Sequence, residues 1–261
     1  MTGLLWPLSG LGFIFIMTAL GAGAALVMPS ANADKARRVF LGFAAGVMTA
    51  AAVFSLLVPA IEEAERTGIP GALPSAGGFA LGALFLFALD SVVPHLHIGS
   101  DVAEGAPSRF RRTTLLISAV TLHNIPEGMA VGLAFALAAG RGDGAYAAAL
   151  ALAIGIGVQN FPEGAAVSLP LRQEGMGRFR AFGAGVLSGA VEPVFGLLAV
   201  AAADAVAPVM PWLLSFAAGA MIYVVVEELI PEARLGEHSH AGTFSVLAGF
   251  IIMMALDVAL G

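Results

Sequence analysis

The feature that most constrains this chain is a series of eight apolar stretches. They run from about 3 to 28, 39 to 61, 74 to 94, 113 to 139, 145 to 170, 179 to 203, 210 to 230 and 242 to 260. Most reach the ~20 residues that a helix needs to cross a bilayer. Segments of about ten residues with alternating hydrophobicity, which mark membrane β-barrels, are not seen, so the spans should be helical. The sequence predicts an all-α polytopic membrane protein with eight transmembrane helices.

Composition agrees with this prediction. Only 11% of the residues are charged and 59% are hydrophobic, whereas soluble domains have roughly 25% charged residues. No connection is long enough to form a soluble domain, so we expect one transmembrane domain over residues 1–261. The lipid bilayer is therefore the expected partner, and no nucleic acid is. The chain has no cysteine, which excludes disulfides, thiolate metal ligands and cysteine catalysis.

The distribution of Lys and Arg predicts the orientation. Ten of the twelve fall in the connections after spans 1, 3, 5 and 7, and two, Arg66 and Arg141, fall on the other side. Cytoplasmic loops carry the excess of basic residues in membrane proteins, so both termini should face away from the cytoplasm. The first charged residue is Asp34. The start therefore lacks the basic region of a signal peptide, and we expect the first span to be retained.

Two internal repeats are visible. "HNIPEGMAVG" (123–132) and "QNFPEGAAVS" (159–168) are offset by 36 residues and fall on spans 4 and 5. "LGFAAGVM" (41–48) and "LSFAAGAM" (214–221) match at six of eight positions, on spans that enter the membrane from opposite sides. This is the pattern that an inverted duplication of spans 1 to 3 as spans 6 to 8 leaves, with spans 4 and 5 as a central pair. Chance similarity between Ala/Gly-rich helices stays open as the alternative.

Spans 4 and 5 each carry a polar patch. Residues three and four apart share one face of a helix, which groups His123, Asn124 and Glu127 on span 4, and Gln159, Asn160 and Glu163 on span 5. A proline lies inside each motif, at Pro126 and Pro162. Because proline clashes with the carbonyl four residues earlier, we expect a kinked central pair whose freed carbonyls are extra oxygen ligands.

The buried acids need compensation. An ionised side chain at the centre of the bilayer costs about 2.5–3.5 kcal/mol, so Glu127, Glu163 and Glu192 together cost on the order of 9 kcal/mol. No lysine or arginine lies in an apolar core, which leaves protons or a bound metal. An imidazole beside carboxylates suits zinc and neighbouring divalent ions. Met48 offers a thioether, although an apolar packing role is the simpler interpretation.

Further acids and histidines cluster at the ends of the spans. Near the cytoplasmic ends of spans 3 and 7 lie Asp90, His95, His97, Glu227 and Glu228. We interpret them as a release route, with ordinary solvated helix ends as the alternative. Near the outer face lie Glu62, Glu63 and Glu65, and Asp257. The three glutamates either attract cations or form a plain acidic loop, and Asp257 either caps its helix or lines a vestibule.

These motifs resemble the ZIP (Zrt/Irt-like protein) metal transporters, specifically the bacterial GufA-like branch. The resemblance rests on the paired "HNIPEG" and "QNFPEG", on "FAAGVM" in span 2 and on "EP" in span 6. It implies transport of divalent cations, most often zinc, into the cytoplasm across a bacterial cytoplasmic (inner) membrane. Cd²⁺, Fe²⁺ and Mn²⁺ stay open as further substrates; no organic cofactor is expected. The sequence leaves the oligomeric state open, a homodimer included.

The resemblance also implies the ligand sets. The first subsite would contain His123, Glu127, Gln159 and Glu163; the second would contain Met48, Asn124, Asn160, Glu163 and Glu192, with Glu127 and Glu163 bridging the two. Asn160 departs from relatives that carry aspartate or histidine there, which lowers the negative charge of the second subsite. The release-route residues also match positions linked to release in the family.

Two other classes of function stay open. An intramembrane zinc hydrolase needs three protein ligands, an open position for water and a general base, typically from His-Glu-x-x-His on an unbroken helix. This chain has a single histidine within the spans. A metal-selective channel, or a proton-coupled carrier of another solute, is the other alternative. Our leading hypothesis is a carrier that works by alternating access, not an enzyme.

Overall fold

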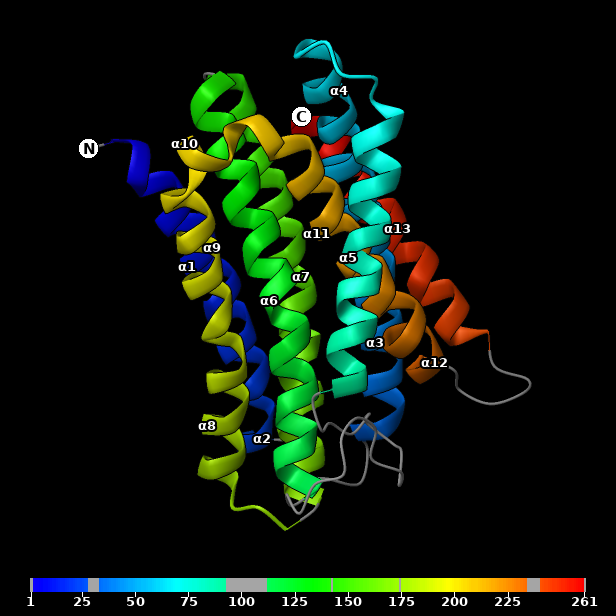
Figure 1. Cartoon of the computed structure of the whole chain (residues 1–261). Helices are drawn as coiled ribbons and strands as arrows, with labels where there is room; N and C mark the ends of the chain where they lie inside the picture. The colour runs from blue at the N-terminus through cyan, green and yellow to red at the C-terminus, as the bar shows by residue number, and fades with distance from the viewer. Residues whose placement is uncertain are drawn as a thin grey trace.

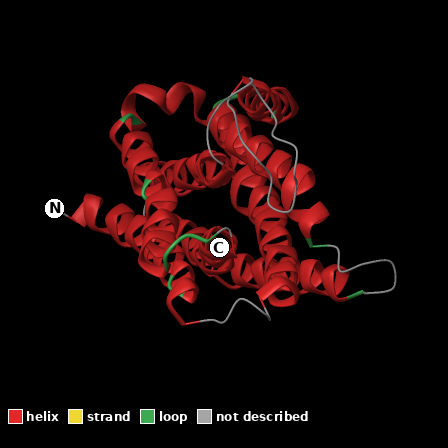
Figure 2. Cartoon of the chain, turned by 90° about the horizontal axis from the view of Figure 1, so that it is seen from below, coloured by secondary structure: helices red, strands yellow, loops and turns green. Residues whose placement is uncertain are grey.

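The chain folds into a bundle of long helices (Figure 1). The computed structural model describes residues 2–27, 33–92, 112–141, 143–173, 175–233 and 240–260. The elements are α1 (Thr2–Ala22), α2 (Ala24–Val27), α3 (Ala33–Ala50), η2 (Ala51–Leu57), α4 (Val58–Arg66), α5 (Ala72–Val92), α6 (Arg112–Arg141), α7 (Asp143–Gln173), α8 (Arg178–Gly189), α9 (Val191–Ala201), α10 (Ala203–Val206), η3 (Ala207–Val209), α11 (Met210–Val224), η4 (Val225–Leu229), α12 (Ile230–Glu232) and α13 (Ala241–Leu260). No strand occurs among these residues (Figure 2), which confirms the all-α prediction.

Seven of the predicted spans are helices long and apolar enough to cross a membrane. The remaining one, α6, has the length, but its hydropathy is lowered by His123, Asn124 and Glu127. These helices make the chain a multi-pass membrane protein. α1 begins and α13 ends at the same end of the bundle, as an even number of spans requires (Figure 1).

Several spans are less regular than the sequence predicted. The sixth breaks at Ala190, between α8 and α9. The cause is Pro193, whose ring clashes with the carbonyl of Gly189 in a continuous helix. Spans 2 and 7 contain the π-helical segments η2 and η4. By contrast, α6 and α7 stay helical through Pro126 and Pro162, so the expected kinks stay a prediction.

The helix contacts follow the symmetry of an inverted repeat. α3 packs on α13 and α11 packs on α5, while α1 packs on α7 and α9 packs on α6. If spans 1–3 are exchanged with spans 6–8, and span 4 with span 5, the α3–α13 pair becomes the α11–α5 pair. In the same way, the α1–α7 pair becomes the α9–α6 pair. α3 and α11 run in opposite directions (Figure 1), and each continues into a π-helical segment. These contacts favour the inverted duplication over chance similarity.

Glycine lets backbone meet backbone at each of these four interfaces. An added Cβ would overlap a carbonyl oxygen across the interface at Gly46 (Val246), Gly219 (Phe79), Gly164 (Thr18) and Gly128 (Glu192). Close approach through small residues is a usual means of packing helices in membranes, where the hydrophobic effect does not drive association. The repeated small residues in the sequence therefore serve packing.

Candidate metal centre

The polar residues of the central pair lie together inside the bundle. α6 packs on both α7 and α9, and each residue assigned to the patch is buried: His123, Asn124, Glu127, Gln159, Asn160, Glu163 and Glu192. The structure thus confirms that both motifs turn inward. Glu192 joins them because the break at Ala190 places it in the first turn of α9, where the helix dipole favours a negative charge.

Hydrogen bonds between helices fix several of these side chains. The amide of Gln159 donates to Glu127 Oε1 at 2.8 Å, linking α7 to α6. The amide of Asn124 donates to the carbonyl of Ser188 at 3.0 Å, linking α6 to α8. Both amides therefore turn their nitrogen toward a protein acceptor, which leaves their oxygens as the atoms that can ligate a cation.

The three buried acids interact with one another. Glu163 lies within electrostatic range of both Glu127 and Glu192, and also of His123 and Glu228. Negative charges that lie near one another in a buried site repel strongly. A divalent cation among them removes that repulsion and supplies the charge that the apolar cores lack.

Several buried oxygens of the cluster have no hydrogen-bond partner among the described residues. They are Asn124 Oδ1, Glu127 Oε2, Gln159 Oε1, Asn160 Oδ1 and Glu192 Oε2. A buried polar atom left without a partner costs about 1–3 kcal/mol, more when it is charged. These oxygens come from three helices that meet at one place, and carboxylate and amide oxygens are cation ligands. The residues therefore fit a divalent ion as cargo.

The donors are not arranged as a ready-made His/Asp/Glu site. Within the described part of the chain, no three such side chains are placed so that they could hold one ion. Amide oxygens from Asn124, Gln159 and Asn160 must therefore complete the coordination, or the acids must shift toward the ion when it binds. Either arrangement suits a substrate that is bound transiently better than a resident structural metal, whose site is closed.

His123 contacts Glu228, one of the acids of the predicted release route. Its Nδ1 lies 2.5 Å from Oε2 of Glu228, which is buried on η4. A carboxylate that accepts from one ring nitrogen orients the other, Nε2, as a metal ligand. Glu228 thus lies beside the candidate site, and its assignment to the release route stays a prediction. No local pattern could indicate this contact, because spans 4 and 7 are far apart in the chain.

A small cavity joins these residues to the end of the bundle where α12 lies. It has a volume of about 20 Å³ and is lined by His123, Glu163, Glu228 and Glu232, among others. That volume is on the scale of one water molecule. It extends the polar site toward the predicted cytoplasmic side, and it adds Glu232, which the sequence did not single out.

The other predicted residues differ in their burial. Met48 is fully buried in the apolar core, so its role as a ligand stays a prediction. Asp90 is buried on α5, and Glu227 is exposed on η4. His95 and His97 lie outside the described residues.

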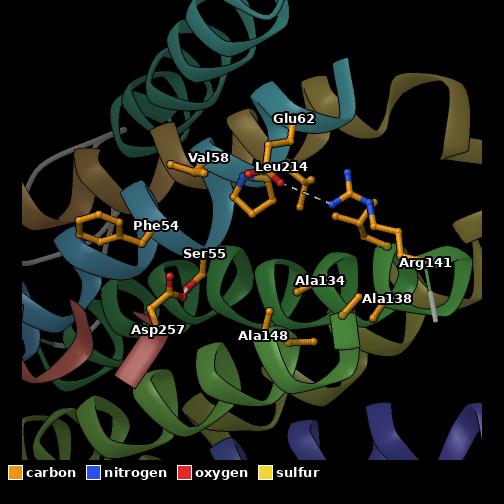
Figure 3. Close-up of a pocket in the computed structure, with 14 residues that line it drawn as sticks. Phe54, Ser55, Val58, Glu62, Ala134, Ala138, Arg141, Ala148, Leu214 and Asp257 are labelled. Atoms are coloured by element: carbon orange, nitrogen blue, oxygen red, sulfur yellow. Dashed lines mark hydrogen bonds and ion pairs between the residues drawn. The ribbon is translucent and has the colours of Figure 1, made fainter. Parts of the chain in front are cut away.

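A larger pocket opens at the opposite end of the bundle (Figure 3). Its volume is about 310 Å³, and its lining includes Glu62, Arg141 and Asp257. Ser55 donates a hydrogen bond of 2.6 Å to Asp257. Asp257 thus lines a vestibule, and the pocket brings acidic oxygens near the predicted outer face.

Glu63 is not the solvated acid that the sequence left open as one reading. It is 6% exposed and accepts hydrogen bonds from Arg66 at 2.5 Å and from Arg141 Nε at 3.0 Å. Arg141 comes from the end of α6, so this ion pair ties α6 to α4. Glu63 is therefore neutralised by arginine and is not a cation attractor.

We expect Glu63→Gln to lower the free energy of unfolding by about 1–3 kcal/mol. The reason is that hydrogen bonds between charged groups contribute ~1.5–3 kcal/mol to stability. Most of the effect should come from the bond to Arg141, because Arg66 is exposed and its ion pair is screened by solvent. The melting temperature of the purified protein measures this. Glu65→Gln on the same helix, which changes an exposed side chain, should stay within ~0.5 kcal/mol. Equal effects of the two variants would contradict the special role of the buried pair.

Comparison with known proteins places these features in context. A family model described as "ZIP Zinc transporter" matches residues 95–257. The chain is 38% identical to zinc transporter ZIP11 of Bos taurus, over 96% of each chain. It is 37% identical to zinc transporter GufA of Myxococcus xanthus, over 94% of this chain and 95% of the relative. It is 39% identical to zinc transporter ZIPB of Bordetella bronchiseptica, over 95% of this chain and 79% of the relative.

Proposed function

The chain belongs to the ZIP zinc transporter family, and from this premise we propose that it carries Zn²⁺ into the cytoplasm through the cluster between α6, α7 and α9. The family assignment makes the protein a transporter of divalent metal across a membrane and sets the hydrolase aside, because its relatives are named zinc transporters. The inward direction is what the resemblance to the family implies, and the positive-inside orientation tells only which end of the bundle faces the cytoplasm.

One observation carries the assignment of the site. Buried carboxylate and amide oxygens of α6, α7 and α9 have no hydrogen-bond partners among the described residues. Glu127, Glu163 and Glu192 also lie within electrostatic range of one another. A cation that binds there satisfies the oxygens and offsets the repulsion in one step. Ligands that must lose protons to bind metal also make uptake sensitive to pH.

The two cavities suggest the path. Hydrated metal enters the vestibule beside Glu62 and Asp257, exchanges water for Glu127, Glu163 and His123, and leaves past Glu228 and Glu232. Asp90, His95, His97 and Glu227 stay candidates for the last part of the release route. Because the inner cavity has room for about one water, release needs a change of conformation, as alternating access provides.

Several finer features belong to the same proposal. We place the protein in a bacterial cytoplasmic membrane, with both termini outside and residues 1–261 forming one transport domain. Met48, Asn124, Asn160 and Glu192 form a second subsite that shares Glu163 with the first. Cd²⁺, Fe²⁺ and Mn²⁺ are tested as competing substrates, and a homodimer is compatible with the proposal but not required by it.

Uptake into proteoliposomes tests the function. Intact protein should take up zinc with saturable kinetics; a rate that rises linearly with zinc toward the diffusion limit would indicate the channel alternative. His123→Ala should lower kcat/KM for zinc at least about tenfold, because loss of groups around a metal typically costs 10–100-fold. His240→Ala, which removes an exposed histidine, is the matched control. If His123→Ala takes up zinc at the wild-type rate, His123 is not a ligand of the proposed site.

A further inference from the structure

The side chain of Thr18 is buried where α1 meets the metal centre. Its hydroxyl lies 3.0 Å from Glu192 Oε1 and 3.1 Å from the carbonyl of Ile14, and the residue is 2% exposed. The contact joins two spans that are separated by 174 positions. Thr18 also lies outside residues 95–257, which the family model matches.

Close packing fixes Thr18 in this position. A Cβ added to Gly164 on α7 would overlap the carbonyl of Thr18, and one added to Gly189 on α8 would lie 2.7 Å from Thr18 Cγ2. The same Cβ would lie 3.3 Å from Glu192 Oε1. Two glycines thus form a slot that holds the threonine against the carboxylate, and the hydroxyl has little room to turn elsewhere.

The hydrogen bond makes the two oxygens of Glu192 unequal. A hydroxyl has one proton to donate, and an ionised carboxylate is a stronger acceptor than a helix carbonyl that is already bonded. Oε1 is therefore held by Thr18. Oε2 is buried and no donor lies at hydrogen-bond geometry to it among the described residues; the nearest polar side chains to this carboxylate besides Thr18 are the amide of Asn160 and the acid of Glu163.

We infer that Thr18 is a positioning residue of the metal site: it holds one oxygen of Glu192 so that the carboxylate offers a single oxygen to the ion. The inference rests on the proposed function, because it takes Glu192 to be a ligand. A carboxylate held in this way binds in monodentate fashion, which favours Zn²⁺. A released carboxylate can bind with both oxygens, which suits a larger ion such as Cd²⁺.

Zinc binding by purified variants, measured by competition with a fluorescent chelator, tests the inference. Thr18→Val keeps the shape of the side chain and removes the hydroxyl. We expect this variant to bind zinc ~10-fold more weakly, as for other residues that orient metal ligands. We also expect its Zn²⁺/Cd²⁺ affinity ratio to shift toward Cd²⁺. Thr18→Ser, which keeps the hydroxyl, should restore both values to within about twofold. Wild-type affinity and ratio in Thr18→Val would overturn the inference.

A double-mutant cycle separates positioning from packing. If Thr18 acts through Glu192, then Thr18→Val combined with Glu192→Gln should bind zinc no more weakly than Glu192→Gln alone. A further tenfold loss in the double variant would mean that Thr18 acts through packing, and would overturn the inference. Normal zinc binding by Glu192→Gln would also overturn the inference while leaving the proposed function intact. Normal zinc binding by Glu163→Ala, by contrast, would count against the proposed site itself.

Discussion

Glu163→Gln is expected to abolish saturable zinc uptake and to weaken zinc binding at least about a hundredfold, because even residues that only orient metal ligands contribute 10–100-fold to affinity. The effect should exceed that of any other single ligand. Glu163 is within electrostatic range of Glu127, Glu192 and His123, and it also lines the inner cavity. It therefore takes part in both proposed subsites and in the exit from them.

The substitution is chosen to change charge while keeping shape. Glutamine fills the same volume, so the fold should be retained, and the melting temperature without metal checks this. Asp204→Asn, which removes one exposed negative charge from α10, is the matched control and should transport zinc normally. Zinc uptake by folded Glu163→Gln at the wild-type rate would show that the ion passes elsewhere.

Gly46→Leu is expected to prevent normal folding. Any side chain here overlaps the backbone of α13, because an added Cβ would lie 2.7 Å from the amide nitrogen of Phe250 and closer still to the carbonyl of Val246. Backbone atoms cannot move aside as a flexible side chain can. We expect a loss of ~3 kcal/mol or more, seen as a large fall in the yield of monodisperse protein and in the melting temperature of what remains.

Gly12→Leu provides the matched control on another spanning helix. A Cβ at Gly12 meets nothing within 4 Å, and replacing glycine in a helix interior otherwise stabilises the helix by up to ~1 kcal/mol. This variant should fold at least as well as the wild type. If both variants fold equally well, close packing of α3 on α13 is not required for the fold.

Much of the fold could be predicted from apolar length alone, since a helix in lipid must satisfy its own backbone. The spacing of His123, Glu127 and Glu163 also predicted correctly that one face of each central helix is polar and buried. Helical periodicity defines a face in this way. The repeat at "FAAG" predicted an inverted duplication, and the paired interfaces agree with it, because glycines that permit close contact recur at equivalent positions.

Periodicity does not tell which helices are neighbours in space. The contacts of His123 with Glu228 and of Thr18 with Glu192 join spans that are distant in sequence, and no local pattern marks them. Glu63 looked like a loop acid because its partner Arg141 lies 78 residues away. What the sequence missed, therefore, were pairings set by the packing of whole helices.

The glycine contacts divide the bundle into two mechanical parts. Among the described glycines, every overlap with a neighbouring helix's backbone falls within α1 and α6–α9 or within α3–α5 and α11–α13. Between the two parts, Gly155 meets only the flexible side chain of Met253. A slide of one part against the other would keep Glu127, Glu163 and Glu192 together, but it would have to break the ion pair of Glu63 with Arg141 that ties α4 to α6. Such a slide would also separate His123 on α6 from Glu228 on η4. A bound ion would then move with Glu127, Glu163 and Glu192 and leave Glu228 behind.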